Sequence, residues 1–426
     1  MARRLLADSA MVAVCTLIGS VLSYGFSFVL AHQLDKAAYG QIGALLMILL
    51  VASIPATAVQ AVTARRVARA ACTDTAALRE LAGPLIRWAL ITGVVTTAAL
   101  ALLAPAISAA LPAVSVGAVA WTSLSLLPFA LISGYLGVAQ GACRFTAFSV
   151  MFIAMNGAKL VAGKAAALFT PNPGLIMAAM AVSWFIVTAA CHYTLRDAVG
   201  RPSMRRGLGY VRELGGASWS LGAVLVLSLL DGLLSAHYFS GDELGRYQAG
   251  AMFTRAGYFG PLFVAVLAYP KLAVPETRRR ALIQATAYSV GIGALIVACT
   301  AVAATPMIRI AFGAKYLGDP AGFDLSSAAW LFGLAGAVQA LVQLALLDAV
   351  ARRSTAIGWL VFAGIGVETA AILAFAHHSP AQLITTAALV GTATAAVSLT
   401  VSAFAKHPVV VPAPEQSGSE YAPVAP

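Results

Sequence analysis

Two oppositely charged residues lie in apolar segments on either side of one turn of the chain. The turn is 241–247, the segment before it carries Asp231, and the segment after it carries Arg255. If both segments are membrane-spanning helices, Asp231 lies roughly 12 Å and Arg255 roughly 15 Å below one membrane surface. Charges at that depth are costly and mark functional sites. The pair predicts either an anion site or a structural ion pair that locks the hairpin. In the first case Arg255 binds phosphate oxygens, and Asp231 has a gating or ion-coupling role.

A third buried charge occurs in the first half of the chain. Lys159 lies roughly 18 Å into an apolar segment, with Asn156 one turn before it on the same helical face. No acidic residue of the first half lies at that depth, so we expect Lys159 to face a polar cavity. Lys159 and Asn156 are therefore predicted to contact substrate.

Polar residues in the last third of the chain add further candidates. Glu368 lies inside an apolar segment, where it predicts a proton or sodium site or an interhelical hydrogen bond. Gln339 and Gln343 are four residues apart, so one helical face is polar. That face predicts either sugar contacts or polar helix packing.

Neither a catalytic nor a metal-binding pattern is present. The five cysteines are far apart without metal spacing, and the phosphate-binding pattern G-x-x-x-x-G-K-[ST] does not occur. We therefore expect no enzyme activity, no cofactor and no metal.

The composition is that of a polytopic membrane protein. Of the 426 residues, 60% are hydrophobic and 10% are charged, whereas soluble domains carry about a quarter charged residues. The net charge of +11 does not indicate nucleic-acid binding, because the basic residues lie between apolar segments. Twelve segments are long enough to span, at roughly 9–31, 40–64, 84–104, 118–140, 147–169, 175–195, 215–238, 245–269, 281–304, 324–348, 354–376 and 381–405. These predict an all-α integral membrane fold.

The basic residues predict the orientation. Nineteen of the 27 lysines and arginines fall on the side of the two termini, and only Lys36, Arg309 and Lys315 fall in loops on the other side. The positive-inside rule then places both termini in the cytoplasm of a cell-membrane protein.

The twelve segments divide into two halves. Residues 1–195 form an amino-terminal lobe of six helices, 196–214 a cytoplasmic linker, 215–405 a second six-helix lobe and 406–426 a disordered tail. A shift of 205 residues matches seven of 24 positions, including His32 with His237 and Gly40 with Gly245. Six helices per half predict parallel repeats related by an axis along the membrane normal.

Two turns carry a family resemblance. Leu34-Asp35-Lys36-Ala37-Ala38-Tyr39-Gly40 resembles the L-x-x-x-x-Y-G turn of polysaccharide and O-antigen flippases, and 239–247 resembles the turn that opens their eighth helix. These flippases belong to the multidrug/oligosaccharidyl-lipid/polysaccharide exporter superfamily. The resemblance implies a two-lobed flippase that moves an undecaprenyl-diphosphate-linked glycan across the cytoplasmic membrane. It also implies contact with membrane lipids, a glycan polymerase and glycosyltransferases.

Three alternatives stay open. A multidrug antiporter of the same superfamily would share the fold, although Lys159 would repel a cationic drug. A non-transporting scaffold of a glycan-synthesis complex would need no cavity. A major-facilitator transporter would carry a Gly- and Asp-containing basic motif, which Arg65-Arg66-Val67-Ala68-Arg69 lacks.

Overall fold

The protein is all-helical over the residues that its computed structural model describes, which are 2–70, 75–200, 208–272, 274–318, 322–352 and 354–405. The first group of helices, named here the N-lobe, is α1 (Ala2–Gln33), α2 (Lys36–Ala52), α3 (Ile54–Ala70), α4 (Thr75–Ala110), α5 (Val116–Leu124), α6 (Leu126–Gly141), α7 (Phe145–Phe169) and α8 (Pro173–Thr194). The second group, the C-lobe, is α9 (Leu208–Tyr238), α10 (Gly241–Leu272), α11 (Pro275–Val302), α12 (Ala304–Ala311), the 3₁₀ turn η1 (Ala314–Tyr316), α13 (Leu325–Ala351), α14 (Ala356–Ala374) and α15 (Pro380–Phe404).

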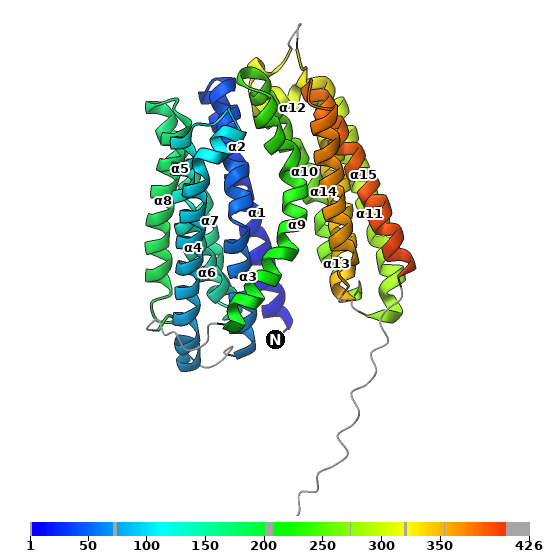
Figure 1. The fold of residues 1–426 in the computed structure, drawn as a ribbon. Helices are drawn as coiled ribbons and strands as arrows, with labels where there is room; N and C mark the ends of the chain where they lie inside the picture. Colours follow the sequence, from blue (N-terminus) through cyan, green and yellow to red (C-terminus); the bar gives the residue numbers. More distant parts are fainter. Residues whose placement is uncertain are drawn as a thin grey trace, which may run out of the picture.

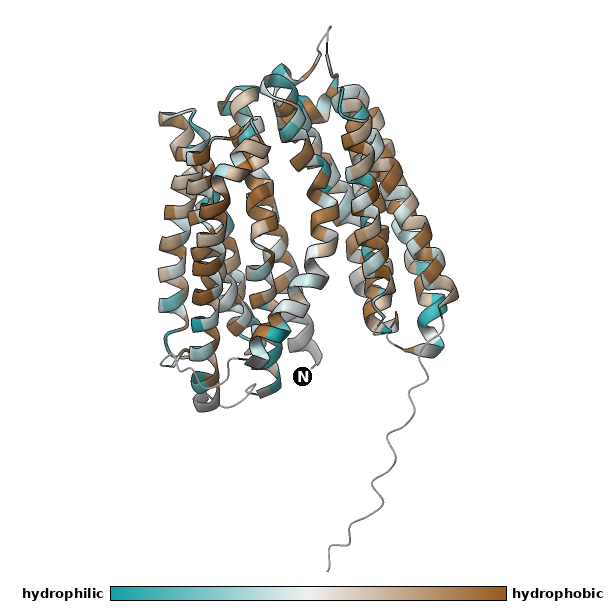
Figure 2. Ribbon diagram, viewed as in Figure 1, coloured by the Kyte–Doolittle hydropathy of each residue, from teal (hydrophilic) through white to brown (hydrophobic). Residues whose placement is uncertain are grey.

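The helix lengths confirm a polytopic membrane protein and agree with twelve spans. Within the described ranges, nine helices are long and apolar enough to cross a membrane, and the bent pair α2–α3 makes ten. The more polar helices α9 and α10, with 31 and 32 residues, are each about 47 Å long and complete the set. Hydrophobic residues cover the length of the bundle, and hydrophilic residues gather at its two ends (Figure 2).

The two lobes stand side by side, with α9 running between them (Figure 1). We call the end that carries Arg66, Arg144 and Arg279 the basic end, and the end with the α1–α2 and α9–α10 turns the hairpin end. The division at residues 195 and 215 stays a prediction. α9 begins at Leu208, inside the segment predicted as a linker, and the predicted tail 406–426 lies outside the described residues.

The second span is broken in the middle, which differs from the continuous segment 40–64 that we predicted. α2 and α3 meet at an angle of 43°. Pro55 has no amide hydrogen to donate to a preceding carbonyl, so the helical ladder is interrupted here. The hydroxyl of Ser53 binds the carbonyl of Leu50 at 2.8 Å beside the break. α2 packs against α10 of the C-lobe, whereas α3 packs against α6 of its own lobe, so the break separates two different surroundings.

The predicted repeat has a direct structural counterpart. α1 and α9 end at Gln33 and Tyr238, which are 205 residues apart, and α2 and α10 begin with the same offset. The equivalent glycines Gly40 and Gly245 pack against each other across the lobes. A Cβ atom on Gly40 would lie 2.7 Å from the amide nitrogen of Gly245, so only glycine allows this approach.

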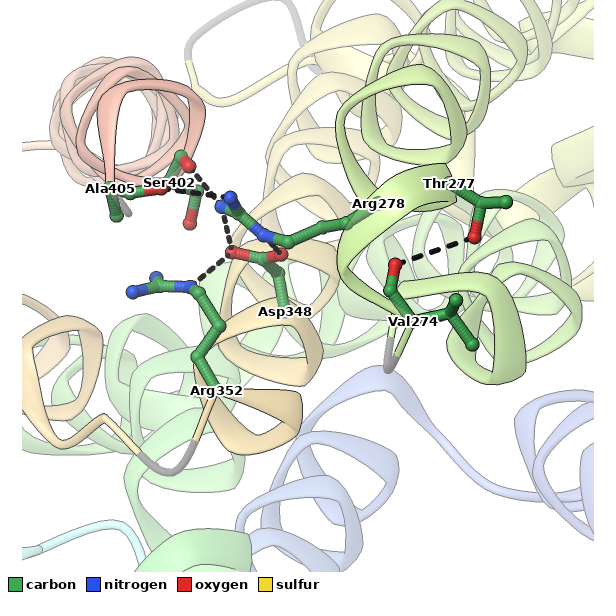
Figure 3. Close-up of polar contacts among 7 residues, drawn as sticks. All are labelled: Val274, Thr277, Arg278, Asp348, Arg352, Ser402 and Ala405. Carbon is green, nitrogen blue, oxygen red and sulfur yellow. Dashed lines mark hydrogen bonds and ion pairs between the residues drawn. The ribbon is translucent and has the colours of Figure 1, made fainter. Parts of the chain in front are cut away.

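A buried charge cluster joins three helices of the C-lobe at the basic end (Figure 3). Asp348 of α13 is fully buried and accepts hydrogen bonds from Arg278 of α11 at 2.7 and 3.0 Å and from Arg352 at 3.0 Å. Arg278 also donates to the carbonyls of Ser402 and Ala405 at the end of α15. The cluster therefore fixes α11, α13 and α15 relative to one another.

The first turns of α9 are held by the N-lobe. Glu213 receives two hydrogen bonds from Arg66 of α3, at 3.1 and 3.2 Å. The ring of Tyr210 stacks on Trp88 with centroids 5.6 Å apart and lies beneath the Arg66 guanidinium. The hydrogen bonds from Arg66 hold the pKa of Glu213, which lies before the membrane-spanning part of α9, below its ordinary value. The seam between α3 and α9 is thus closed at the basic end.

Candidate functional site

A cavity of about 490 Å³ lies between the lobes and receives side chains from both. Its N-lobe wall comes from α1, α2, α3, α6, α7 and α8, and its C-lobe wall comes from α9, α10 and α13. Six of the seven predicted site residues line this cavity: Lys159, Asn156, Arg255, Asp231, Gln339 and Gln343. A volume of this size encloses a drug-sized molecule or the headgroup of a lipid.

Lys159 lies in the N-lobe wall, and within the described part of the chain no carboxylate pairs with it. Its ammonium donates a hydrogen bond to the hydroxyl of Ser23 on α1 at 2.8 Å and lies 4.9 Å from the centroid of the Phe26 ring. The α1 and α7 helices pack closely, so Ser23 and Phe26 hold the lysine side chain against the wall. An ammonium group has three donors, and the contact with Ser23 uses one of them.

Arg255 occupies the opposite wall, and it does not form the ion pair with Asp231 that we considered. The only hydrogen bond of its guanidinium within the described residues is a long contact of 3.8 Å with the sulfur of Met252. The register explains the difference. α10 begins at Gly241, so Arg255 lies about 21 Å along α10, whereas Asp231 lies about 10 Å from the end of α9. The depths predicted from the sequence assumed that the second helix begins at residue 245, four residues after the observed start of α10.

Asp231 instead pairs with Tyr247, which lies level with it on α10. The tyrosine hydroxyl donates to the carboxylate at 2.8 Å, and both residues are buried. Next to this pair, Gln248 donates to the carbonyl of Gly232 and the hydroxyl of Ser235. Asp231 therefore belongs to a polar contact between α9 and α10, with its side chain at the edge of the cavity.

Glu368 lies outside the cavity, within the C-lobe. Its side chain is buried, and its Oε1 atom has no hydrogen-bond partner among the described residues. The interhelical hydrogen bond that we considered for Glu368 does not occur within the described ranges.

The three candidate amide residues line the cavity. Asn156 donates to the carbonyl of Phe152 on its own helix at 2.9 Å. Gln339 is buried, and its Oε1 atom has no partner among the described residues. Gln343 lies one turn further along α13. The polar face of α13 is therefore directed towards the cavity.

Sequence reasoning missed an apolar wall of the cavity. Trp184 lines the cavity with four other large apolar residues of the N-lobe. These are Phe129, Phe152, Met155 and Met180. The indole of Trp184 donates to the carbonyl of Met155 at 3.1 Å, which fixes the ring. The spacing of Phe152, Met155, Asn156 and Lys159 on one helical face was the available indication.

An aromatic cluster packs between the lobes at the hairpin end. The ring of Tyr39 lies 5.8 Å from that of Tyr316 and 6.2 Å from that of Phe312, measured between centroids. Phe28 lies 5.5 Å from Phe312. Because Tyr39 and Phe28 come from the N-lobe and the other two from the C-lobe, the cluster closes the cavity at this end.

Three polar contacts accompany the aromatic cluster. Lys36 forms an ion pair with Asp242, Lys315 donates to the carbonyl of Leu34, and His237 contacts the carbonyl of Ala110. Each contact joins one lobe to the other. The hairpin end is therefore held shut by packing, charge and hydrogen bonding together.

Within the described ranges, no group of three histidine, cysteine, aspartate or glutamate side chains could hold a metal ion. That the whole chain lacks a metal site remains a prediction from the spacing of its cysteines. The cavity offers cationic, amide, hydroxyl and apolar surfaces, which suit binding of an amphipathic ligand.

Comparison with known proteins identifies the fold. No family model matches the sequence, and no curated protein matches it. Solved structures do match. An inward-facing multidrug resistance MATE transporter of the MOP superfamily has a TM-score of 0.71 and 11% identity over 92% of this chain and 97% of its own. The lipid II flippase MurJ, in an inward closed conformation, has a TM-score of 0.71 and 10% identity over 92% of this chain and 87% of its own.

A third match is a MOP superfamily transporter from Pyrococcus furiosus, described with a reversed polarity of its binding pocket. It has a TM-score of 0.61 and 13% identity over 93% of this chain and 94% of its own. All three neighbours are transporters or flippases rather than enzymes. The chain is a multi-pass membrane protein, and its fold is similar to those of the MATE and MurJ structures.

Proposed function

We propose that this protein is a flippase-type transporter that moves a lipid-diphosphate-linked oligosaccharide from the inner to the outer leaflet for surface polysaccharide export. The observation that carries the proposal is the pair of cations in one cavity. Lys159 and Arg255 both line it, and neither has a carboxylate partner within hydrogen-bond distance among the described residues. A buried cation without a hydrogen-bonded counter-charge is costly, so an anionic ligand would supply that partner.

The two cations differ in the way each would bind a diphosphate. The planar guanidinium of Arg255 can bind two phosphate oxygens at once, whereas the ammonium of Lys159 offers a point charge with free donors. Asn156, Gln339 and Gln343 would then contact the sugar through their amide groups. The undecaprenyl-diphosphate-linked class of substrate rests on the resemblance of the two turns.

The packing of the lobes favours a ligand that enters from the bilayer. α1 and α10 both line the cavity, and their backbones make few or no close contacts with each other. The other seam, between α3 and α9, is closed by Arg66 and Glu213. A lipid tail could therefore stay in the membrane between α1 and α10 while the headgroup enters the cavity.

The proposed orientation places the basic end in the cytoplasm of a cell-membrane protein, following the positive-inside rule. The cavity is closed at the hairpin end, so rocking of the lobes would expose it alternately to the two sides. Moving about two negative charges outward across 100 mV releases roughly 4.6 kcal/mol. Ion exchange at the buried carboxyl group of Asp231 or Glu368 offers a second energy source.

A multidrug antiporter is the second candidate function, because the apolar wall of Phe129, Phe152 and Trp184 suits a lipophilic drug. The two cations oppose a cationic drug. The third alternative, a scaffold without transport activity, makes no use of the cavity.

The test is transfer of a fluorescent polyprenyl-diphosphate disaccharide between the leaflets of vesicles that contain the purified protein. Lys159→Met and Arg255→Gln should each slow transfer at least about tenfold, since a hydrogen bond to a charged group contributes about 1.5–3 kcal/mol. Lys164→Met is the matched control, because Lys164 lies on the same helix, is exposed and does not line the cavity. Unchanged transfer in both cavity variants, or protein-dependent movement of a lipophilic cation alone, would refute the proposal. Failure of the wild-type protein to move any lipid would favour the scaffold.

A further inference from the structure

The side of α3 that faces the cavity continues beyond the cavity towards the basic end. Ile54 and Thr57 of α3 line the cavity. Arg65 follows Ile54 by about three helical turns, so the two side chains lie on the same side of the helix. Ala61 lies between them on this side, and both Ala61 and Arg65 are exposed. Arg65 therefore lies beside the mouth of the cavity, about 12 Å along α3 from Thr57.

This mouth lies at the end of the molecule where the lobes separate. Apart from α9, the helices of the two lobes lie further apart at the basic end than at the hairpin end (Figure 1). The aromatic cluster around Phe312 closes the hairpin end. α3 packs against α9, at the other seam from the proposed lipid opening between α1 and α10. Arg65 therefore faces an entering headgroup from the far wall.

Three arginines of α3 lie near one acidic residue at the mouth. Glu213 of α9 accepts hydrogen bonds from Arg66 on both carboxylate oxygens. These hydrogen bonds, and to a smaller extent the charges of Arg65 and Arg69, hold the pKa of Glu213 below its ordinary value. Arg65 and Arg69 are exposed, and no carboxylate within the described ranges lies at ion-pair distance from either. The mouth therefore carries an excess of positive charge.

We propose that Arg65 captures the anionic headgroup of a lipid-linked diphosphate at the mouth of the cavity, before the headgroup reaches Lys159 and Arg255. An exposed charge adds little to affinity, because water and salt screen it. Its main effect is on the rate of encounter with a charged ligand. Fixed cations at the mouth of a cleft raise the local concentration of an anion and its rate of entry.

A capture step of this kind makes the rate of transfer depend on salt. The screening length is about 30 Å at 0.01 M salt and about 3 Å at 1 M salt. The charge of Arg65 therefore acts across the mouth and into the cavity at low salt, and it acts only on groups in contact with it at high salt. Contacts of a ligand inside the cavity are screened much less.

The positive-inside rule alone accounts for arginines at the basic end, so the test needs an arginine that only obeys this rule. Arg79 is exposed at the basic end of the same lobe, and none of the described residues of its helix, α4, lines the cavity. Arg79→Gln removes the same charge as Arg65→Gln and leaves the mouth unchanged. Arg65→Lys keeps the charge at the mouth and changes the shape of the group.

The capture role rests on the proposed function, and the same transfer assay tests both. Movement of the fluorescent polyprenyl-diphosphate disaccharide is measured in phosphatidylcholine vesicles, which carry no net surface charge. The rate is recorded over a range of probe concentrations, in about 0.01 M and in about 1 M salt.

At low salt and limiting probe, Arg65→Gln should lower the rate about 1.5- to 5-fold, the range for one exposed ion pair, and should leave the rate at saturating probe unchanged. The difference should vanish at high salt, and Arg65→Lys and Arg79→Gln should match the wild type throughout. An equal loss in Arg79→Gln, a loss that persists at high salt, or a wild-type rate in Arg65→Gln at low salt would overturn the capture role and leave the flippase proposal standing. A wild-type protein that moves no probe would overturn both.

Discussion

Removal of the carboxylate of Asp348 should be among the most destabilising single changes in the C-lobe. Asp348 is fully buried and is the only acid in a cluster with Arg278 and Arg352 (Figure 3). Asp348→Leu removes three hydrogen bonds to guanidinium groups, each contributing about 1.5–3 kcal/mol before the surroundings relax. It also leaves two cations buried without a counter-charge. Loss of one partner from a buried ion pair costs about 3–5 kcal/mol, which shifts the folding equilibrium more than about 100-fold.

Arg352→Met provides the comparison that makes this prediction specific. Arg352 contributes one hydrogen bond to Asp348, and its buried Nη2 atom has no partner among the described residues. Removing Arg352 leaves one cation and one anion, which are joined by the two bonds from Arg278. We therefore expect Arg352→Met to lower the free energy of unfolding by less than about 2 kcal/mol, because removal of an unpaired buried charge partly offsets the lost hydrogen bond.

The assay is reversible unfolding of the purified protein by SDS in mixed micelles, followed by tryptophan fluorescence. Asp348→Leu should unfold at a clearly lower SDS fraction than Arg352→Met, and the wild type at the highest. Equal SDS unfolding midpoints for the two variants would refute the reasoning. A loss of less than about 1 kcal/mol of unfolding free energy in Asp348→Leu would refute it as well.

Three further changes test other parts of the structure. Gly40→Ala places a methyl group 2.7 Å from the backbone of Gly245, so it should shift spin-label distances at the hairpin end towards the open state; an unchanged distribution would contradict the close packing. Glu213→Gln should raise amide exchange in the first turns of α9 about 1.5- to 5-fold at neutral pH, as expected for a surface ion pair. Because the pKa of Glu213 is lowered by Arg66, the wild-type contact persists above the ordinary glutamate value and is lost as the pH falls through the lowered pKa, where variant and wild type should converge. Glu368→Gln should leave substrate binding intact and remove any dependence of transport on a proton or sodium gradient; retained dependence would exclude Glu368 from coupling.

The sequence supported the architecture better than it supported the contacts of individual side chains. Hydropathy and length predicted the spans, and helical spacing placed Lys159 and Asn156 on one face, which the cavity confirms. The Asp231–Arg255 distance could not be predicted, because it depends on where α10 begins. A shift of four residues moves a side chain about 6 Å along a helix and turns it by more than a full turn.

Counting basic residues at the ends of the spans did not reveal that some of these residues are buried. Arg278 and Arg352 were counted among the basic residues that flank the spans, yet each is only 6% exposed. The spacing of Asp348 and Arg352, four apart at the end of a span, was the available indication. The partner from α11 comes from a segment 70 residues away, and such a contact is set by helix packing that no local pattern reports.

The contact between Gly40 and Gly245 has a consequence for the origin of this chain. In a symmetric dimer, a residue on the twofold axis meets its own copy in the partner. Here two glycines at equivalent repeat positions meet across the lobes in that way. A six-helix ancestor that paired with itself would have needed only one glycine to form this contact, and gene fusion would have doubled it. The two halves differ around this contact, with Phe26 and Leu50 in one half at the positions of Asp231 and Arg255 in the other. A single chain can carry such a one-sided charge pattern, whereas a symmetric homodimer would repeat each charge in both halves.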